Sequence, residues 1–377
     1  MEQRDLPGRA IKLKTSLLLL ILSVSLALAQ NPSLDLQWKG QASLIHASSL
    51  SGSFDVSPTT LRYIPQLRLD YQMNSTTRLG FDAAIDLYSH ALGATSITTN
   101  GDLYRFTMRY DTPRTQVRVG LQKINFGPAR MLRVLQWFDQ LDPRDPLALS
   151  PGVWAGMGRY YFENGANIRL WTMVDTPEPM RDYWGDKSGS PWDMGGRLEY
   201  PVPAGTLGLT LHSMDVTRET QVTENRLAVD ARFDAIVGLW SELVYSRTKF
   251  GIADPINSVT AMAGVDYTFG VGNGLYIALE SLTSHTSNGD GNLLWVAGST
   301  ALMGTYTLGL ADGLTAYLYA INFPHIETQY IPMLGWQHTR GNWLYYLALY
   351  DMPEMEAVGS IALPTGTGIQ FNIAFNH

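Results

Sequence analysis

The sequence lacks cysteine altogether and has few charged side chains, which make up 16% of its 377 residues. Without cysteine it can form neither a disulfide framework nor a thiolate metal site. The absence also suits a chain that crosses an oxidising compartment unfolded, because no wrong disulfide can form. The several long apolar spans that an inner-membrane transporter needs are missing too. The uncharged stretch 293–311 is interrupted by serine, threonine and glycine, so we expect a long strand or a hairpin there.

An excess of basic side chains is also missing. The chain has 27 basic and 34 acidic residues, and without residues 1–29 the counts fall to 23 and 32, a net charge of −9. Nucleic-acid-binding surfaces are basic, so the sequence argues against a nucleic-acid partner. The seven histidines show no metal-ligand spacing, and no glycine-rich phosphate loop follows a strand. We therefore expect no metal and no cofactor.

Residues 1–29 have the features of a cleaved signal peptide. A basic head precedes an apolar run of about a dozen residues, which is short for a membrane helix of about 20. Ala27, Leu28 and Ala29 supply a small-x-small cleavage pattern, which argues against the alternative of a membrane-anchoring helix. We expect the mature chain to begin at Gln30 and to fold as one domain over residues 30–377. The basic head consists of Arg4, Arg9, Lys12 and Lys14.

What the sequence does contain is repeated alternation of apolar and polar residues, as in membrane β-strands that face lipid on one side and a lumen on the other. A soluble sandwich has the same period. Aromatic residues at strand ends favour the membrane, because such residues form girdles at its two interfaces. The sequence therefore predicts an all-β fold, a transmembrane antiparallel β-barrel of about 16 strands within a range of 14–18. The alternating segments include 67–73, 78–87, 104–110, 117–121, 226–234 and 261–269, and the aromatic ends are Tyr71, Tyr110, Tyr200, Phe269 and Tyr350.

The C-terminal residues carry a more specific pattern. Gly368 is followed by Phe371, Ile373 and Phe375, which lie on one face of an extended strand. The pattern resembles the C-terminal signal of bacterial outer-membrane barrels, which commonly ends at the aromatic residue, whereas two more residues follow here. The resemblance implies the outer membrane of a Gram-negative bacterium. It also implies the barrel-assembly machinery as a partner and a surrounding of outer-membrane lipid and lipopolysaccharide.

One long segment, residues 125–155, lacks alternation. It is rich in tryptophan, phenylalanine, leucine and methionine, so it is not expected to be disordered. Residues 131–138 are compatible with a short helix that the following prolines would end. In size and position the segment resembles the inward-folded constriction loop of bacterial porins. The alternative is an ordered loop outside the pore.

Charge is unevenly distributed along the chain. Between Arg62 and Arg133 there are ten basic and five acidic residues, whereas from Phe250 onward only Arg340 is basic and nine residues are acidic. This predicts a lumen with one basic and one acidic side, which would set solute and ion selectivity. Ordinary paired charges remain the alternative for each residue. The expected pore-lining residues are Arg68, Arg105, Arg109 and Arg118, with Arg130, Arg133, Asp139, Asp142 and Asp145 on the long segment.

Two rival functions remain. His285 and Ser287, in the sequence His-Thr-Ser-Asn-Gly, resemble the motif of the outer-membrane phospholipase family, in which they would serve as base and nucleophile. That family's downstream Ser-Trp-Asn-Arg segment is missing, and the residues equally suit a hairpin turn. In the second rival function, the barrel anchors or forms part of a larger surface complex, with the aromatic-rich segment 180–185 and Trp192 as contact surfaces.

The resemblance to bacterial porins as a class favours passive diffusion of small hydrophilic solutes. It implies a channel without cofactor or covalent chemistry. It also leaves open a homo-oligomer or an association with other outer-membrane proteins.

Overall fold

The computed structural model describes residues 33–51, 57–92, 96–139, 147, 149–150, 152–174, 193–217, 221–324, 326–352 and 366–377. The expected signal peptide, Asp142, Asp145 and the segment 180–185 with Trp192 lie outside these residues. None of the described residues forms a helix that is long and apolar enough to cross a membrane.

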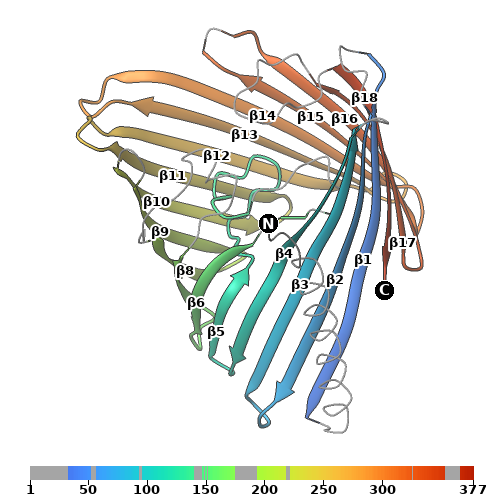
Figure 1. Ribbon diagram of the computed structural model, residues 1–377. Coiled ribbons are helices and arrows are strands. Elements are labelled where there is room, and N and C mark those ends of the chain that lie inside the picture. The colour runs from blue at the N-terminus through green and yellow to red at the C-terminus, as the bar shows by residue number, and fades with distance from the viewer. Residues whose placement is uncertain are drawn as a thin grey trace, which may run out of the picture.

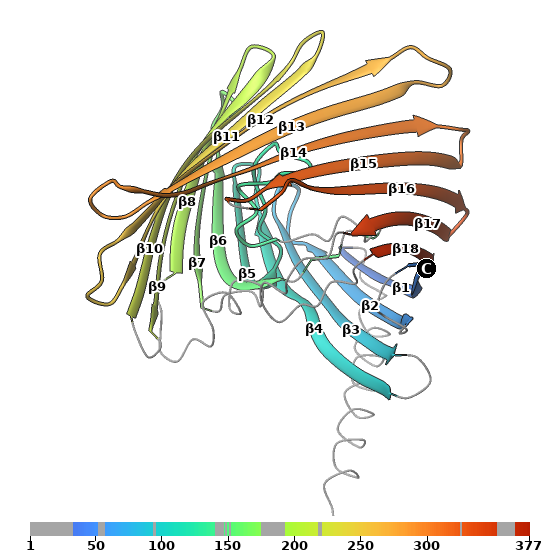
Figure 2. The same ribbon diagram turned by 90° about the horizontal axis from the view of Figure 1, so that it is seen from above.

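Eighteen antiparallel strands form one closed sheet (Figures 1 and 2). Each strand pairs with its neighbours in the sequence, and β1 also pairs with β18. Closure leaves no strand edge unpaired, which a structure surrounded by lipid requires. The strands are β1 (Leu34–Ser49), β2 (Pro58–Gln72), β3 (Arg78–Leu92), β4 (Ser96–Asp111), β5 (Thr115–Gln122), β6 (Val153–Tyr161), β7 (Asn167–Met173), β8 (Asp193–Val202), β9 (Gly205–Thr217), β10 (Gln221–Asp234), β11 (Gly238–Phe250), β12 (Ile256–Phe269), β13 (Leu275–Ser287), β14 (Leu293–Thr307), β15 (Asp312–Asn322), β16 (Gln329–Arg340), β17 (Trp343–Met352) and β18 (Gly366–Asn376).

The expected count of about 16 strands is two too low, although 18 lies within the expected range. Alternation fails toward the extracellular ends of β6 and β7, where inward positions carry Met157, Trp171 and Met173 instead of polar residues. These side chains are buried against the long segment between β5 and β6. Apolar residues on both faces remove the period of two that marks a lumen-facing strand. The uncharged stretch 293–311 is mostly one long strand, β14.

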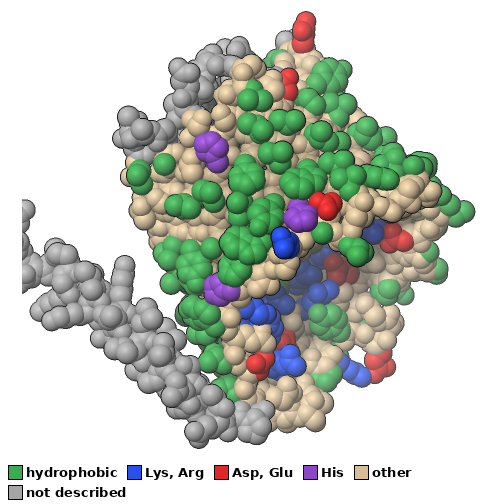
Figure 3. Space-filling model, turned by 90° about the vertical axis from the view of Figure 1, so that its right-hand side faces the viewer, with side chains coloured by type: hydrophobic (Ala, Val, Ile, Leu, Met, Phe, Trp, Pro, Cys, Tyr) green, Lys and Arg blue, Asp and Glu red, His purple; other side chains and the backbone are tan. Residues whose placement is uncertain are grey.

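Register and burial separate the two faces of the wall. On β11, for example, Leu239, Leu243 and Tyr245 are exposed, whereas the alternating Trp240 and Glu242 are buried. Figure 3 shows hydrophobic side chains spread over the outer surface and charged side chains gathered in the hollow below them. An apolar outer face around a polar interior is the arrangement of a transmembrane barrel.

The two ends of the barrel differ in their connections. At one end the turns are short: β4 ends at Asp111 and β5 begins at Thr115. At the other end β5 ends at Gln122 and β6 begins only at Val153. Outer-membrane barrels have short periplasmic turns and longer extracellular loops. The end with the turn between β4 and β5 is therefore periplasmic, and the end with the connection between β5 and β6 is extracellular.

Four of the five aromatic residues expected at strand ends are exposed on the outer face next to the periplasmic turns. Tyr350 differs: it points inward at the extracellular end of β17, is 5% exposed and covers Gly368 of β18. The four residues that follow the expectation are Tyr71, Tyr110, Tyr200 and Phe269.

The C-terminal strand closes the barrel between β17 and β1. Ile369, Phe371, Ile373 and Phe375 occupy its outward positions, as the alternation predicts. The two residues beyond the aromatic position extend the pairing with β1. Asn376 lies opposite Gln41, and the backbone of His377 exchanges hydrogen bonds of 2.9 and 3.0 Å with Gly40. Recognition of this strand by the assembly machinery stays a prediction.

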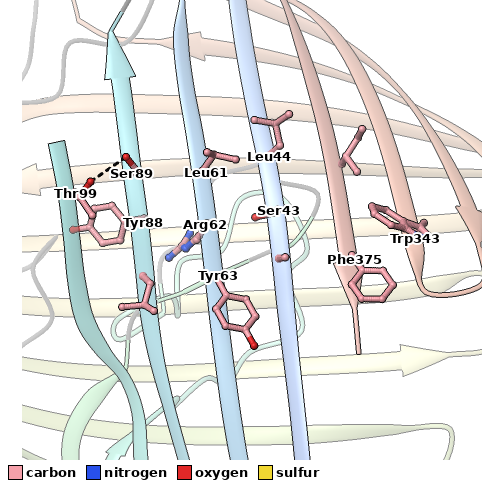
Figure 4. A pocket seen from close by; sticks show the side chains of 13 residues that line it. Ser43, Leu44, Leu61, Arg62, Tyr63, Tyr88, Ser89, Thr99, Trp343 and Phe375 are labelled. Carbon is pink, nitrogen blue, oxygen red and sulfur yellow. Dashed lines mark hydrogen bonds between the residues drawn. The ribbon is translucent and has the colours of Figure 1, made fainter. Parts of the chain in front are cut away.

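A groove of about 550 Å³ lies on the outside of the barrel, over β1 to β3, β17 and β18 (Figure 4). Leu44, Leu61, Tyr63, Trp343 and Phe375 line it from outward positions. The groove therefore faces lipid and is separate from any path through the lumen.

Candidate functional site

The described part of the segment between β5 and β6, mainly residues 123–139, lies within the ring of strands (Figures 1 and 2). Its aromatic residues pack against the inner wall. Phe126 stacks on Trp171 of β7 with ring centroids 5.5 Å apart, and Phe138 meets the ring of His212 of β9 at 5.0 Å. Trp137 is buried beside them. Apolar burial therefore holds this part of the segment against β7 and β9.

A buried glutamate on the inner face of β13 binds the segment's backbone. Glu280 is 0% exposed. Its Oε1 accepts hydrogen bonds from the backbone N–H of Arg130 at 2.7 Å and from Trp240 Nε1 at 2.9 Å. Its Oε2 accepts from the N–H groups of Met131 at 2.9 Å and Leu132 at 2.6 Å. One carboxylate thus fixes three consecutive backbone donors of the segment.

A second glutamate, Glu242 on β11, binds backbone N–H groups on both sides of the three residues that Glu280 holds. Its Oε1 accepts from the N–H of Ala129 and its Oε2 from that of Leu135, both at 3.0 Å. Gly127 approaches this carboxylate so closely, at a φ of +92°, that a Cβ atom there would overlap Glu242 Oε1. Glycine alone accommodates both the positive φ and the close approach without strain.

The short helix expected at residues 131–138 is wrong, because the described part of the segment contains no helix. A helix that began at Met131 would leave its first four N–H groups free and would commit the N–H of Leu135 to the carbonyl of Met131. Here the N–H of Leu135 donates to Glu242 instead, and those of Met131 and Leu132 donate to Glu280. The tertiary contacts decide the local conformation.

The carboxylates of the late strands do not form a free acidic wall. Besides Glu242 and Glu280, Asp266 of β12 lies 3.1 Å from the guanidinium of Arg130. That guanidinium also lies over the rings of Trp240 and Tyr276, 5.5 and 5.1 Å from their centroids. Arg130 is therefore another attachment of the segment. Two carboxylates of the predicted acidic side, Asp266 and Glu280, therefore hold the segment in place.

On the opposite wall, the four arginines expected to line the pore meet around one cavity of about 250 Å³. They come from β2, β4 and β5, and Lys123 extends the set from the start of the long segment. Asp82 is the one carboxylate among the lining residues. The lining consists of Gln66, Arg68, Asp82, Arg105, Thr107, Arg109, Arg118, Gln122 and Lys123.

Two of these arginines are neutralised locally. Arg68 lies 2.9 Å from Asp70, and Arg109 lies 2.7 Å from Asp70 and 2.6 Å from Asp111. Bridges of this kind fix the guanidinium planes and remove most of their net charge from the lumen.

Arg105 and Arg118 differ from that pair. Arg105 donates to the backbone carbonyls of Tyr104 at 2.6 Å and Ser150 at 2.9 Å. Within the described ranges, no carboxylate lies within 4.0 Å of either guanidinium, and the Nε of Arg118 is buried without a hydrogen-bond partner. These two side chains are the source of uncompensated positive charge beside the cavity.

Asp139 and Arg133 form an ion pair within the segment. Asp139 is 1% exposed, and its carboxylate lies 3.2 Å from Lys123 Nζ and 2.9 Å from Arg133 Nη1. Both oxygens thus face cations at the point where the segment leaves β5. We expect Asp139 to order the segment more than to face a passing solute.

Three further inward arginines were not predicted. Arg159, Arg169 and Arg197 lie directly opposite one another on β6, β7 and β8. Arg159 and Arg197 pair with Glu199, whereas Arg169 donates to the carbonyl of Asn125 at 3.1 Å. The sequence feature that could have indicated their inward position is the alternation with apolar neighbours, such as those at 168, 170 and 198, which are exposed on the outer face. The strands are short, which hid the alternation.

His285 and Ser287 both occupy outward positions of β13, and residues 288–292 form the hairpin turn that follows. Among the residues that the structure describes, their side chains do not hydrogen-bond to each other. In the same ranges, no group of three or more histidine or carboxylate side chains could hold a metal ion.

Solved structures share this architecture. OccK11 (OpdR) of Pseudomonas aeruginosa gives a TM-score of 0.58 at 10% identity, with 91% of this chain and 95% of that chain covered. OccK5 (OpdH) of the same organism gives 0.56 at 11% identity, with 91% and 98% covered. OmpT in trimer form, an outer-membrane protein of Vibrio cholerae, gives 0.56 at 8% identity, with 92% and 100% covered.

No protein-family model and no curated protein matches the sequence. At such low identities the structural similarity shows a shared fold and nothing more. That fold agrees with the closed sheet and with the apolar outer wall around a polar lumen. The chain therefore has the closed, porin-like β-barrel fold of these bacterial outer-membrane proteins.

Proposed function

We propose that the protein is a passive diffusion channel for small hydrophilic solutes and that it prefers anions. The observation that carries this proposal is the cavity lined by Arg68, Arg105, Arg109, Arg118 and Lys123 beside the inward-folded segment. An uncompensated positive potential in a water-filled constriction attracts anions and repels cations.

The uncharged part of the lumen supports this preference. On β14 to β18, no inward position within the described residues carries a charged side chain. These strands present tyrosine, methionine, serine, alanine and amide side chains instead, so nothing there offsets the arginines. The lumen thus has one cationic side and one neutral, partly aromatic side. Inward residues on the neutral side include Ala301, Met303, Tyr317, Met333, Tyr346, Gln370 and Asn372.

The inward segment supplies the narrowing. It reaches from β5 across to Glu242 and Glu280 on the far wall, and its aromatic core fills the space against β7 and β9. A barrel of this size encloses more space than its own side chains fill. The segment therefore reduces an otherwise wide lumen to a passage beside the arginines.

The proposal requires no cofactor and no covalent step. The partners that we propose are the surrounding lipid and lipopolysaccharide, the barrel-assembly machinery and further copies of the same chain in a homo-oligomer. The phospholipase alternative would be favoured instead if the purified protein hydrolysed phospholipid and Ser287→Ala abolished the activity. The anchor or complex-subunit alternative would be favoured by an intact barrel that conducts no ions.

The direct test is a planar-bilayer recording of the purified, refolded protein with a salt gradient across the membrane. We expect stepwise openings and a reversal potential whose sign indicates anion preference. Silence from a protein whose circular dichroism shows an intact barrel would refute the channel, whereas cation preference would refute the role given to the arginines.

A further inference from the structure

The cavity among the lumen arginines has a polar row at its middle, which the strand register defines. Four residues lie directly across neighbouring strands in this row: Arg68, Asp82, Thr107 and Gly120. Arg105 lies two residues from Thr107 toward the extracellular end of β4, and Arg118 lies two residues from Gly120 toward the periplasmic end of β5. The row that contains Asp82 and Thr107 is therefore placed between two cations without a counter-charge.

The positively charged side chains offer donors to an anionic group. Among the described residues, the Nε of Arg118 is buried without a hydrogen-bond partner, and Lys123 lines the same cavity. The planar fork of a guanidinium matches the two oxygens of a carboxylate. One side of the site is thus suited to a carboxylate.

The cavity also contains a buried acceptor that receives no donor. Gln122 is 2% exposed and lines the cavity from β5. Its Nε2 donates to the backbone carbonyl of Ala155 at 2.8 Å, which fixes the orientation of the amide. In the part of the chain that the structure describes, its Oε1 has no hydrogen-bond partner. A buried acceptor without a donor is costly, so this oxygen favours a ligand that donates.

Two further acceptors lie in the polar row. The hydroxyl of Thr107 donates to the carbonyl of Leu121 at 2.8 Å, so its oxygen can only accept from another group. Asp82 Oδ1 lies 3.9 Å from Arg68 Nε, which is too far for a hydrogen bond. The cavity therefore combines cationic donors with acceptors on one wall of about five strands' width.

This combination restricts the chemistry of the ligand. A simple anion such as chloride uses the cations, but it leaves the acceptors without donors and faces the carboxylate of Asp82. An ammonium group donates to the acceptors, but it lies among three like charges. Hydroxyl groups donate without carrying charge. The volume of about 250 Å³ lies below the roughly 300–1,000 Å³ of pockets for drug-sized ligands, so the ligand is small.

We infer that this cavity binds a sugar acid, that is, a small carboxylate that carries several hydroxyl groups. The carboxylate binds Arg105, Arg118 and Lys123. The hydroxyl groups donate to Asp82, Thr107 and Gln122. The inference rests on the proposed anion channel, and it names the class of solute that the channel prefers.

The test is block of the chloride current through single channels of the refolded protein by three solutes of six carbons each. D-gluconate carries the carboxylate and the hydroxyl groups, hexanoate carries the carboxylate alone, and 6-aminohexanoate is a zwitterion. We expect gluconate to block at a concentration about tenfold lower than either of the others, because only its hydroxyl groups satisfy the acceptors without adding positive charge.

Asp82→Asn tests the acceptor row. The amide replaces one acceptor oxygen by a donor, so the advantage of gluconate over hexanoate should fall by about threefold or more. The ratio of the two solutes cancels the general gain in anion binding that follows from the lost negative charge. The matched control is Asp86→Asn, which removes a carboxylate from the same strand where it pairs with Arg62 outside the cavity, and it should leave the ratio unchanged.

The outcomes separate the sugar-acid site from the channel itself. Equal block by gluconate and hexanoate in a channel that prefers chloride to potassium would overturn the site and leave the channel standing. Stronger block by 6-aminohexanoate would overturn the assignment of hydroxyl groups. A folded barrel without openings would overturn the proposed channel and the inference with it. Thr107→Val, which removes another acceptor, repeats the test should Asp82→Asn fail to fold.

Discussion

Glu280→Gln is expected to detach part of the inward segment from the wall and to give a larger, noisier conductance. The carboxylate accepts hydrogen bonds from three backbone N–H groups and from Trp240 Nε1. A glutamine is the same size, but its amide nitrogen is itself a donor. Each carboxylate oxygen accepts two hydrogen bonds, so in either orientation the amide NH₂ group replaces an acceptor of two buried N–H donors and leaves both without a partner.

The magnitude of this effect follows from those unsatisfied groups. Each buried donor without a partner costs about 1–3 kcal/mol, so two of them weaken the attachment by roughly 2–6 kcal/mol. Two bonds to Glu242 and the aromatic packing of Phe126 and Phe138 remain. The segment should therefore loosen at residues 130–132 while the barrel itself stays folded.

Single-channel recording measures the change, and thermal unfolding measures the stability of the barrel. The control is Asp86→Asn, which removes a carboxylate that is also buried in the inner wall but pairs with Arg62 of β2. An unaltered conductance and noise level in Glu280→Gln would show that the hydrogen bonds do not hold the segment in its place.

The second large effect is expected from the two arginines without a counter-charge. The Arg105→Gln/Arg118→Gln double variant should lose most of the anion preference. At ~6 Å in water a unit charge contributes about 0.7 kcal/mol to the energy of a passing ion. Two such charges give ~1.4 kcal/mol, which raises the local concentration of anions about tenfold and lowers that of cations about tenfold at low salt. Screening should reduce the effect as the salt concentration rises.

The measurement is the reversal potential in a salt gradient, at two ionic strengths. Arg114→Gln is the matched control, because Arg114 pairs with Glu163 in the exposed periplasmic turns. Since Arg105 also binds the carbonyl of Ser150, the single variant Arg118→Gln separates charge from positioning. A reversal potential equal to that of the wild type in both variants would assign the selectivity to other residues.

The alternation of residues predicted the fold well wherever the lumen is polar. On β2 to β5 and on β18, outward apolar and inward polar positions follow the sequence, and the arginines at 68, 105, 109 and 118 line one cavity, whereas their role in a pore stays a prediction. A period of two fixes the face on which each side chain lies. Strand pairing between neighbours in the sequence then brings those side chains together.

What the sequence did not reveal depends on contacts between distant residues. Glu242 and Glu280 look like ordinary lumen charges on alternating strands, and their role appears only once the segment lies against them. The same contacts engage two carboxylates of the predicted acidic side, and the bond from the N–H of Leu135 to Glu242 takes the place of a helical hydrogen bond. They also replace polar by apolar residues at the inward positions near the extracellular ends of β6 and β7.

The central claim is that the segment between β5 and β6 narrows a diffusion pore. Its most direct test is the single-channel conductance of a variant in which residues 128–137 are replaced by a short glycine-serine linker, recorded beside the wild type. The account predicts a larger conductance and passage of larger neutral solutes. An unchanged conductance from a folded barrel would place the segment outside the path of the solute and contradict the claim.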